Sequence, residues 1–199
     1  MRALPVSPAC ERNREPILAC IAPVLAGARR VVEIGSGTGQ HAAWFAPRLP
    51  HLAWVTTDLP GNHDAIRGWA EASGATNIEG PLALDTLRQS WPELGATDAA
   101  FSANTAHIMP EPAVVAMFEG LGARLPAGAP FCLYGPFMEQ GRHTSESNQR
   151  FDEELRLQGH GMGVRDLGWL LQFAALAGFE LEGAEPMPAN NRLLLWRRT

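Results

Sequence analysis

The segment VVEIGSGTGQH, residues 31–41, places three glycines at alternate positions directly behind a run of strand-forming residues. Glycine at a strand-to-helix turn permits a positive φ and lets a ligand approach the backbone where a Cβ would clash. The N–H groups at the start of the following helix then face the same ligand. This segment therefore predicts a ligand-binding turn at the carboxyl end of a β-strand.

From residue 30 onward, short runs of strand-forming residues alternate with helical patterns. Such alternation favours βαβ units and a mostly parallel sheet. The last two runs, FELEGAE and RLLLWRR, are close enough in sequence to pair as an antiparallel hairpin. We therefore predict an α/β fold with a seven-stranded sheet, and the 199 residues fit a single domain. The expected strands are residues 29–34, 52–58, 81–85, 98–104, 130–135, 179–185 and 192–198.

Two segments do not follow this alternation. Residues 1–15 precede a helix that we expect to begin with Pro16, because proline is preorganised for the first helical position. We predict that residues 1–15 form an N-terminal flap. Residues 136–165 form a polar insertion with one short helix around residues 151–155. Long insertions are often functional loops, so we expect this one on the substrate side.

Composition restricts the partners. The net charge is −5 without a block of basic residues, so no nucleic-acid partner is expected. The three cysteines form no C-x-x-C pair, which indicates a reducing cytoplasm. No apolar run approaches the roughly 18 residues of a membrane span, so no membrane partner is expected. The six histidines lack metal-ligand spacing, and no metal is predicted. We expect a cytoplasmic protein.

The glycine spacing separates several nucleotide-type ligands. The dinucleotide fingerprint G-x-G-x-x-G, typical of an oxidoreductase or epimerase, needs a third glycine where Gln40 stands. The phosphate loop G-x-x-x-x-G-K-[ST] is absent. What remains is acid-x-G-x-G-x-G, which looks like the first motif of class I S-adenosylmethionine-dependent methyltransferases. Its residues are Glu33, Gly35, Gly37 and Gly39.

Two carboxylates complement this turn. Asp58 closes the second expected strand, where a mononucleotide-binding fold places an acceptor for the ribose hydroxyls. Asp85 closes the third and is placed to accept from the adenine amino group. The alternative for each acid is a helix cap or a turn residue. Each acid ends one of the two expected strands that follow the glycine turn. This placement matches the binding of an adenosine group, and we therefore predict S-adenosylmethionine as the cofactor.

A wider resemblance covers nearly the whole chain, from Ser7 to Asn191. The segments that carry it are SPACERNREPIL, EIGSGTGQHAAWFA, FSANTAHIM, LYGPF, TSESNQRFDEELR, VRDL and MPANN. Together they resemble the methyltransferase-like 26 family. The resemblance implies a class I methyltransferase fold, a Rossmann-like three-layer sandwich, with S-adenosylmethionine as cofactor and no substrate that can be carried over.

Arg12 and Asn13 lie in the expected flap, which can close over the carboxylate of the cofactor, because arginine binds carboxylates in a bidentate manner. The alternative is a solvated leader. Asn104 ends the fourth expected strand, where related enzymes place a polar group against the substrate or the methionine moiety. Its alternative is a turn asparagine that bonds its own backbone.

The candidate catalytic residues follow the fourth and fifth expected strands. His107, with an ordinary pKa near 6.5, suits a general base, or alternatively caps a helix or bonds a carbonyl. Tyr134 ends the fifth expected strand and is a second candidate catalytic residue. The alternative is a buried tyrosine whose hydroxyl is already hydrogen-bonded within the protein. Asn148 is a substrate contact or a helix N-cap. Asp152 and Arg156 are spaced as a surface ion pair of small value.

Two further interpretations concern caps and turns. Asp166 precedes the last expected helix and is predicted as its N-cap. Asn190 and Asn191 are predicted to form the turn between the last two strands.

The leading functional hypothesis is a methyltransferase that acts on an O, N or S nucleophile of a small molecule. The fourth strand ends in SANT rather than in the clamp that methyltransferases use on exocyclic base amines, which argues against a nucleic-acid substrate. One alternative is a nucleotide-dependent oxidoreductase or epimerase, against which Gln40 argues. The other is a cofactor-binding but non-catalytic sensor or partner subunit with the same fold.

Overall fold

The computed structural model describes residues 3–199 of the chain. They divide into two compact units, Met1–Ser102 and Ala103–Thr199. The strands follow the order β3-β2-β1-β4-β5-β10-β9 in a seven-stranded sheet. The predicted α/β fold with a mostly parallel sheet is thereby confirmed, whereas the single domain stays a prediction.

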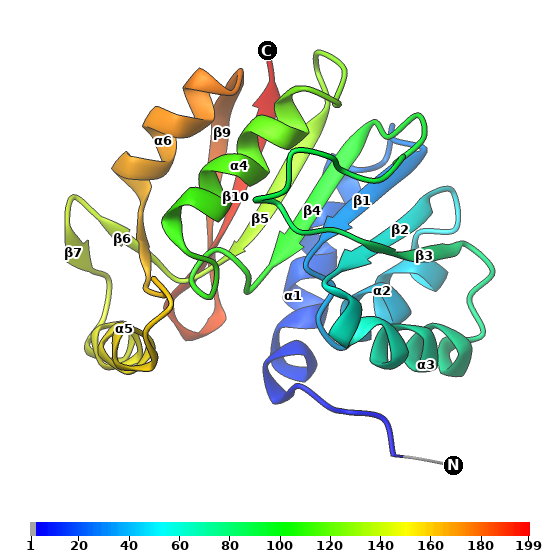
Figure 1. Ribbon diagram of the computed structural model, residues 1–199, viewed down its shortest axis with the longest axis horizontal. Helices are drawn as coiled ribbons and strands as arrows, with labels where there is room; N and C mark the ends of the chain where they lie inside the picture. The colour runs from blue at the N-terminus through cyan, green and yellow to red at the C-terminus, as the bar shows by residue number, and fades with distance from the viewer. Residues whose placement is uncertain (1–2) are drawn as a thin grey trace. The chain divides into compact units, whose positions relative to one another are not determined.

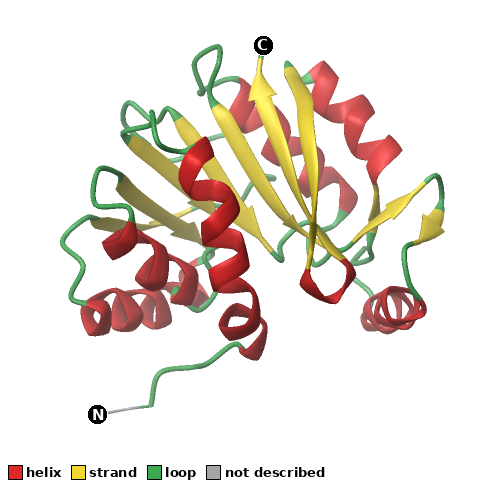
Figure 2. Ribbon diagram, turned by 180° about the vertical axis from the view of Figure 1, so that it is seen from behind, coloured by secondary structure: helices red, strands yellow, loops and turns green. Residues whose placement is uncertain are grey.

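Parallel strands form the centre of the first unit (Figure 1). β1 pairs in parallel with both β2 and β4, and β2 pairs in parallel with β3. Helices α1, α2 and α3 lie together on one face of these strands (Figure 2). The elements are α1 Pro8–Val24, β1 Arg30–Ile34, α2 Gln40–Phe45, β2 Ala53–Asp58, α3 His63–Ser73, β3 Ile78–Ala83 and β4 Ala99–Ala103, with short 3-10 turns at Ala46–Arg48 and Pro60–Asn62.

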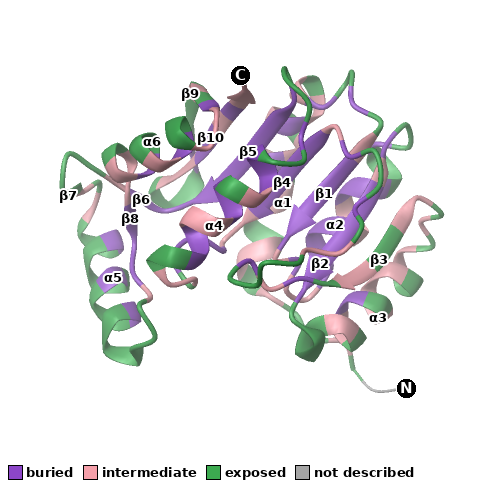
Figure 3. Cartoon of the chain, turned by 45° about the horizontal axis from the view of Figure 1, so that its top comes forward, coloured by how far each residue is buried: buried purple, intermediate pink, exposed green. Residues whose placement is uncertain are grey.

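Strands β1, β2 and β4 of this unit are largely buried, whereas the edge strand β3 is more exposed. In Figure 3, β1 is drawn almost entirely as buried, as parallel strands covered by helices must be. An aromatic cluster of Phe45, Trp54 and Phe101 fills the space beneath α2, with ring centroids 5.5 to 5.6 Å apart. This core fixes the turn between β1 and α2 in place.

The second unit ends in the antiparallel hairpin that the sequence predicts. β10 pairs antiparallel with both β5 and β9, so that Leu194 lies opposite Leu133 on one side and Ala184 on the other. Helices α4 and α6 lie side by side along these strands (Figure 1). The elements are α4 Glu111–Gly122, β5 Pro130–Gly135, β6 Phe137–Glu139, β7 Arg142–His143, α5 Glu146–Gln158, β8 Arg165–Asp166, α6 Leu167–Leu176, β9 Phe179–Met187, a 3-10 turn Pro188–Asn190 and β10 Asn191–Arg198.

The predicted helix start at Pro16 is wrong, because α1 begins at Pro8 and Pro16 lies inside the helix, whereas the role of this segment as a flap stays a prediction. Proline at a helix interior costs about 3 kcal/mol. The buried residues of α1 are Asn13, Ile17 and Ile21, which recur every four residues and form one stripe that continues past Pro16. We attribute the long helix to the burial of this stripe, which outweighs the local cost of the proline.

The third strand begins earlier than predicted and ends before Asp85, because β3 spans Ile78–Ala83. The predicted start at Pro81 is wrong, because Pro81 lies inside the strand. β3 stands at one end of the strand order, and an edge strand tolerates proline because its outer N–H groups need no partner strand.

The polar insertion is more regular than predicted. Within residues 136–165, β6, β7 and the start of β8 belong to a three-stranded sheet of order β7-β6-β8. Its helix, α5, has 13 residues instead of one short turn. No helix among residues 3–199 has the length and apolar character that crossing a bilayer demands.

Candidate functional site

The turn between β1 and α2 has the backbone conformation that its glycines predict. Gly35, Gly37 and Gly39 have φ values of 72°, 58° and 87°. A Cβ on Gly39 would lie 2.8 Å from the Cα of Ile66 on α3, so this glycine is required for helix packing. A Cβ on Gly37 would meet no atom within 4 Å. Of these two glycines, Gly37 is therefore the one that leaves the backbone open to a ligand.

Asp58 at the end of β2 is bonded directly to this turn. Its Oδ2 accepts from the Gly37 N–H at 2.6 Å. Its Oδ1 accepts from the Leu59 N–H at 2.6 Å and from Asn62 Nδ2 at 2.8 Å. A carboxylate oxygen can accept about two hydrogen bonds, so Oδ2 retains acceptor capacity beside the open glycine.

Glu33 lies beneath the turn and faces the protein interior. It is 1% exposed, and its Oε2 accepts from Ser36 Oγ at 2.9 Å and from Trp54 Nε1 at 3.1 Å. Burial raises the pKa of Glu33 to about 7, although the bonds from Trp54 and Ser36 oppose the rise. Glu33 therefore supports the turn from below.

Asp85 follows β3 and adopts the turn role that was its alternative. Its Oδ1 accepts from the Leu87 N–H at 3.1 Å, and its Oδ2 lies 3.7 Å from Arg88 Nε. Its carboxylate is 38% exposed, so it is accessible to solvent as well as to its own turn. A contact with adenine stays a prediction.

The two residues predicted in the flap lie on helix α1 with opposite exposures. Arg12 is exposed. Asn13 is 4% exposed, and its Oδ1 lies 2.8 Å from His41 Nε2 on α2. Burial lowers the pKa of His41 to about 4, so its imidazole is neutral at pH 7. Asn13 therefore joins α1 to the helix that the glycine turn begins.

Gln40 makes a second link between α1 and this turn, which the sequence did not reveal. Its Nε2 donates to Glu11 Oε1 at 3.0 Å. Its Oε1 accepts from Thr38 Oγ1 at 3.1 Å and from the Ser7 N–H. The side chain of Gln40, which stands where the dinucleotide fingerprint has its third glycine, is thus hydrogen-bonded to the start of α1. In the sequence, the only indication that residues 7–15 (SPACERNRE) matter for the site was their resemblance to the methyltransferase-like 26 family.

In the second unit, Asn104 and Tyr134 show the features of their structural alternatives. Asn104 has a φ of 59°, a left-handed conformation that asparagine tolerates, and its N–H donates to the Tyr134 carbonyl at 2.9 Å. Tyr134 is 2% exposed, and its hydroxyl accepts from Asn191 Nδ2 at 2.9 Å. Their proposed roles toward cofactor and acceptor stay predictions.

Asn148 is buried on α5, and the prediction that it caps this helix is wrong. The N-cap is Ser145, whose Oγ accepts from the Asn148 N–H at 3.1 Å. The side chain of Asn148 instead donates from Nδ2 to the Asn190 carbonyl at 2.9 Å and to Thr144 Oγ1 at 3.1 Å. It thereby ties the start of α5 to the turn before β10.

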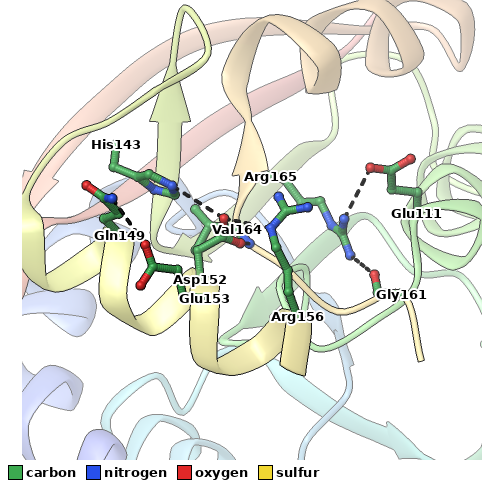
Figure 4. A network of polar contacts seen from close by, with 9 residues as sticks. All are labelled: Glu111, His143, Gln149, Asp152, Glu153, Arg156, Gly161, Val164 and Arg165. Carbon is green, nitrogen blue, oxygen red and sulfur yellow. Dashed lines mark hydrogen bonds and ion pairs between the residues drawn. The ribbon is translucent and has the colours of Figure 1, made fainter. Parts of the chain in front are cut away.

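Asp152 is not part of a surface pair, because it is 4% exposed and serves several donors (Figure 4). Its Oδ2 accepts from Arg156 Nε at 2.8 Å and lies 3.3 Å from His143 Nε2. Its Oδ1 accepts from the Val164 N–H at 2.7 Å. The spacing of Asp152 and Arg156 in the sequence indicated their contact. It did not indicate the further contacts of Asp152 with Val164 and His143.

His107 lies in the segment between β4 and α4 and is 6% exposed. Its ring packs edge-on against Phe151 with centroids 5.3 Å apart. Within residues 3–199 its ring nitrogens have no hydrogen-bond partner. Burial, with a smaller effect of the Arg165 charge, lowers its pKa to about 4, so the expectation of an ordinary pKa near 6.5 is wrong.

The predicted cap and turn near the carboxyl end of the chain are confirmed. Asp166 Oδ1 accepts from the N–H groups of Gly168 at 2.8 Å and Trp169 at 3.3 Å and so caps α6. Asn190 and Asn191 lie where the 3-10 turn Pro188–Asn190 passes into β10. Across the described part of the chain, no group of three or more metal-ligating side chains is placed to hold a metal ion.

Solved structures with the same fold are methyltransferases. An O-methyltransferase family protein from Burkholderia thailandensis matches with a TM-score of 0.80 and 19% identity, over 93% of this chain and 56% of that chain. Human N-acetylserotonin methyltransferase in complex with SAM matches with a TM-score of 0.79 and 17% identity, over 96% and 52%. PigF with SAH matches with a TM-score of 0.77 and 18% identity, over 92% and 61%.

The chain therefore has the class I methyltransferase fold, and it spans 52% to 61% of the length of these three structures. At identities of 17% to 19%, these similarities establish the fold of this chain but not its substrate. A family model described as a protein of unknown function, DUF938, matches residues 4–198, and the chain belongs to this family.

Proposed function

We propose that this protein is an S-adenosylmethionine-dependent methyltransferase that acts on an O, N or S nucleophile of a small molecule. The observation that carries the proposal is the open, positive-φ Gly37, whose N–H is bonded to Asp58 at the end of the neighbouring strand. The resemblance to the methyltransferase-like 26 family supports it. A cytoplasmic location is part of the proposal, supported by three cysteines that are thiols and not disulfides.

The residues of the first unit fit this cofactor in shape and in hydrogen bonding. Gly37 offers a backbone without side-chain obstruction, and Asp58 Oδ2 offers an acceptor suited to a hydroxyl. Glu33 and Gln40 keep the turn in place from the protein side. The residues that we assign to cofactor binding are Arg12, Asn13, Glu33, Gly35, Gly37, Gly39, Asp58, Asp85 and Asn104, of which Asn13 and Glu33 act through the residues they hold.

The second unit supplies the residues that we assign to the acceptor, His107, Tyr134 and Asn148. S-adenosylmethionine, when bound, supplies an electrophilic methyl group. A neutral imidazole with a pKa of about 4 is a weak base, but it is unprotonated at pH 7 and accepts a hydrogen bond from a nucleophile. An attacking hydroxyl or thiol becomes strongly acidic as its new bond to the methyl carbon forms, so for an O or S nucleophile this weak base is sufficient to receive the proton.

Calorimetric titration with S-adenosylmethionine and S-adenosylhomocysteine tests the proposal. We expect micromolar binding, and an Asp58→Ala variant that binds at least tenfold more weakly, a loss of about 1.4 kcal/mol from one charged hydrogen bond. Asp64→Ala is the matched control, because the Asp64 carboxylate is fully exposed and, among residues 3–199, pairs only with Arg67 on the same helix. Circular dichroism of each variant establishes that it is folded.

Absence of heat with either ligand, for the folded wild-type protein, would contradict the proposal. A screen of metabolite extracts with labelled cofactor then separates the enzyme from a cofactor-binding sensor or partner subunit. The sensor would bind cofactor, methylate nothing and retain one stable partner. The enzyme transfers label to a small molecule, and the His107→Ala variant binds cofactor normally but loses turnover.

A further inference from the structure

Arg165, on β8, is a buried arginine that bonds mainly to main-chain carbonyls. Arg165 is 5% exposed. Nε donates to the Ala106 carbonyl at 3.0 Å, and Nη2 donates to the carbonyls of Met109 and Gly161, each at 2.6 Å. Nη1 lies 3.3 Å from Glu111 Oε1 (Figure 4). The Glu111 side chain is 60% exposed, so this ion pair is worth little and the carbonyls are the principal partners.

Two of these carbonyls flank His107 in the chain. Ala106 precedes it and Met109 follows it by two residues, so one guanidinium holds both sides of the segment that carries the imidazole. A guanidinium donates in several fixed directions from one plane, whereas an ammonium group is a compact charge without this fork. The arrangement therefore uses the property that distinguishes arginine from lysine.

The segment 161–165 links His107 to helix α5 as well. The Gly163 N–H donates to the His107 carbonyl at 2.9 Å. The next residue, Val164, donates its N–H to the buried Asp152 of α5 at 2.7 Å (Figure 4). Phe151, which neighbours Asp152 on α5, is the ring that contacts the His107 imidazole. The segment thus joins the backbone of His107 to the helix that supports its ring.

The charge of Arg165 also acts on the imidazole. Burial is the main cause of the low pKa of His107, and the nearby guanidinium lowers it further. Protonating His107 would place a second positive charge beside one that is fixed by backbone bonds. The guanidinium therefore favours the neutral imidazole that can accept a hydrogen bond.

We propose that Arg165 is the positioning residue of His107, because it fixes the segment around His107 against residues 161–165 and so holds the imidazole in the orientation that receives the acceptor. This inference rests on the proposed methyltransferase function for its purpose. Its structural content, that Arg165 controls the position and the charge state of His107, stands independently of any ligand.

Arg198 provides a matched control within the same unit. It also donates to main-chain carbonyls, from Nε to Gly122 at 2.9 Å and from Nη1 to Gly178 at 3.1 Å. Neither carbonyl belongs to the segment around His107. An Arg198→Lys substitution therefore removes a comparable set of bonds, and any loss of general stability that it causes is the baseline for Arg165.

The experiment uses the full chain as Arg165→Lys, Arg165→Met and Arg198→Lys variants. NMR follows the titration of the His107 imidazole and the hydrogen exchange of the Gly163 amide. We expect Arg165→Met to raise the titration midpoint of His107 by about one pH unit, since it removes the opposing charge and loosens the burial. We expect Arg165→Lys to speed exchange of the Gly163 amide at least tenfold relative to Arg198→Lys.

The inference is overturned if His107 titrates as in the wild type in both Arg165 variants and Gly163 exchanges no faster than in Arg198→Lys. Should Arg165→Met fail to fold, Arg165→Lys decides alone through the amide exchange. Neither readout needs a cofactor or turnover, so a negative result leaves the methyltransferase proposal intact. A failure to bind S-adenosylhomocysteine likewise leaves the role of Arg165 unaffected.

Discussion

The Gly37 N–H donates to Asp58 Oδ2 over 2.6 Å and joins the turn after β1 to the end of β2. The two strands are parallel neighbours, with Ile34 opposite Thr57, so their carboxyl ends meet at the same edge. The glycine turn and the carboxylate therefore form one hydrogen-bonded unit. A ligand that contacts either residue acts on both.

Gly37 and Gly39 should respond differently to alanine. Gly37→Ala forces a left-handed alanine, which costs about 1 kcal/mol, but places its methyl in open space, where we expect it to weaken S-adenosylhomocysteine binding at least tenfold. Gly39→Ala places its methyl 2.8 Å from Ile66 Cα, and we expect a stability loss of about 3 kcal/mol. Urea unfolding and calorimetry measure both. Equal stability losses in the two variants would refute this division of roles.

Glu33 should make the folded state less stable as the pH rises. Its pKa is about 7 in the folded state against an ordinary 4.5, so the folded protein holds a proton that the unfolded chain releases between these values. The stability present below pH 4.5 is lost as the pH rises through 7. Glu33→Gln removes this titration, and we expect the variant to gain on the order of 3 kcal/mol relative to the wild type between pH 4.5 and 8.

Urea unfolding at both pH values measures the effect of Glu33→Gln. The control is Glu79→Gln, because Glu79 is a half-exposed partner of Arg30 in the same unit. A constant difference between Glu33→Gln and the wild type across this range would show that folding does not raise the pKa of Glu33.

His41 should have the opposite dependence on pH. Its pKa is about 4 in the folded state against 6.5, so the unfolded chain takes up a proton first as the pH falls. The stability that it contributes is present above pH 6.5 and lost on acidification toward pH 4, by on the order of 3 kcal/mol. His41→Phe retains a ring against Phe45 but cannot bond Asn13, so we expect lower stability at pH 7 and a shallower acid loss.

Urea unfolding at pH 4.5 and 7 compares His41→Phe with the wild type. Identical acid losses in the two proteins would mean that another group governs this range.

Asp152 should be a strong determinant of stability in the second unit, unlike its neighbour Glu153. Asp152→Asn turns one acceptor into a donor that faces Arg156 and His143, so we expect a cost of about 2 kcal/mol in urea unfolding. Glu153→Gln is the matched control, because Glu153 is exposed and accepts a hydrogen bond from Gln149, and we expect a change below about 0.5 kcal/mol. Comparable effects of the two substitutions would contradict the role of Asp152 as a buried acceptor.

The alternation of strands and helices along the chain, the glycine turn, the hairpin and the cap of α6 could all be predicted from the sequence. These features depend on short-range rules: positive φ at Gly37, the carboxyl-terminal place of Asp58 on its strand, and the side-chain cap at Asp166. Each rule involves only residues within one element or its adjoining turn. Local patterns are therefore sufficient to predict them.

Where α1 begins and why the pKa values of His41 and His107 are lowered follow only from tertiary packing. The bond from Asn13 to His41 joins residues 28 apart, and that from Arg165 to Ala106 joins residues 59 apart. The helical stripe continues past Pro16, and His107 is desolvated, only because distant segments cover them. Burial depends on the packing of the whole unit, and no local pattern in the sequence contains it.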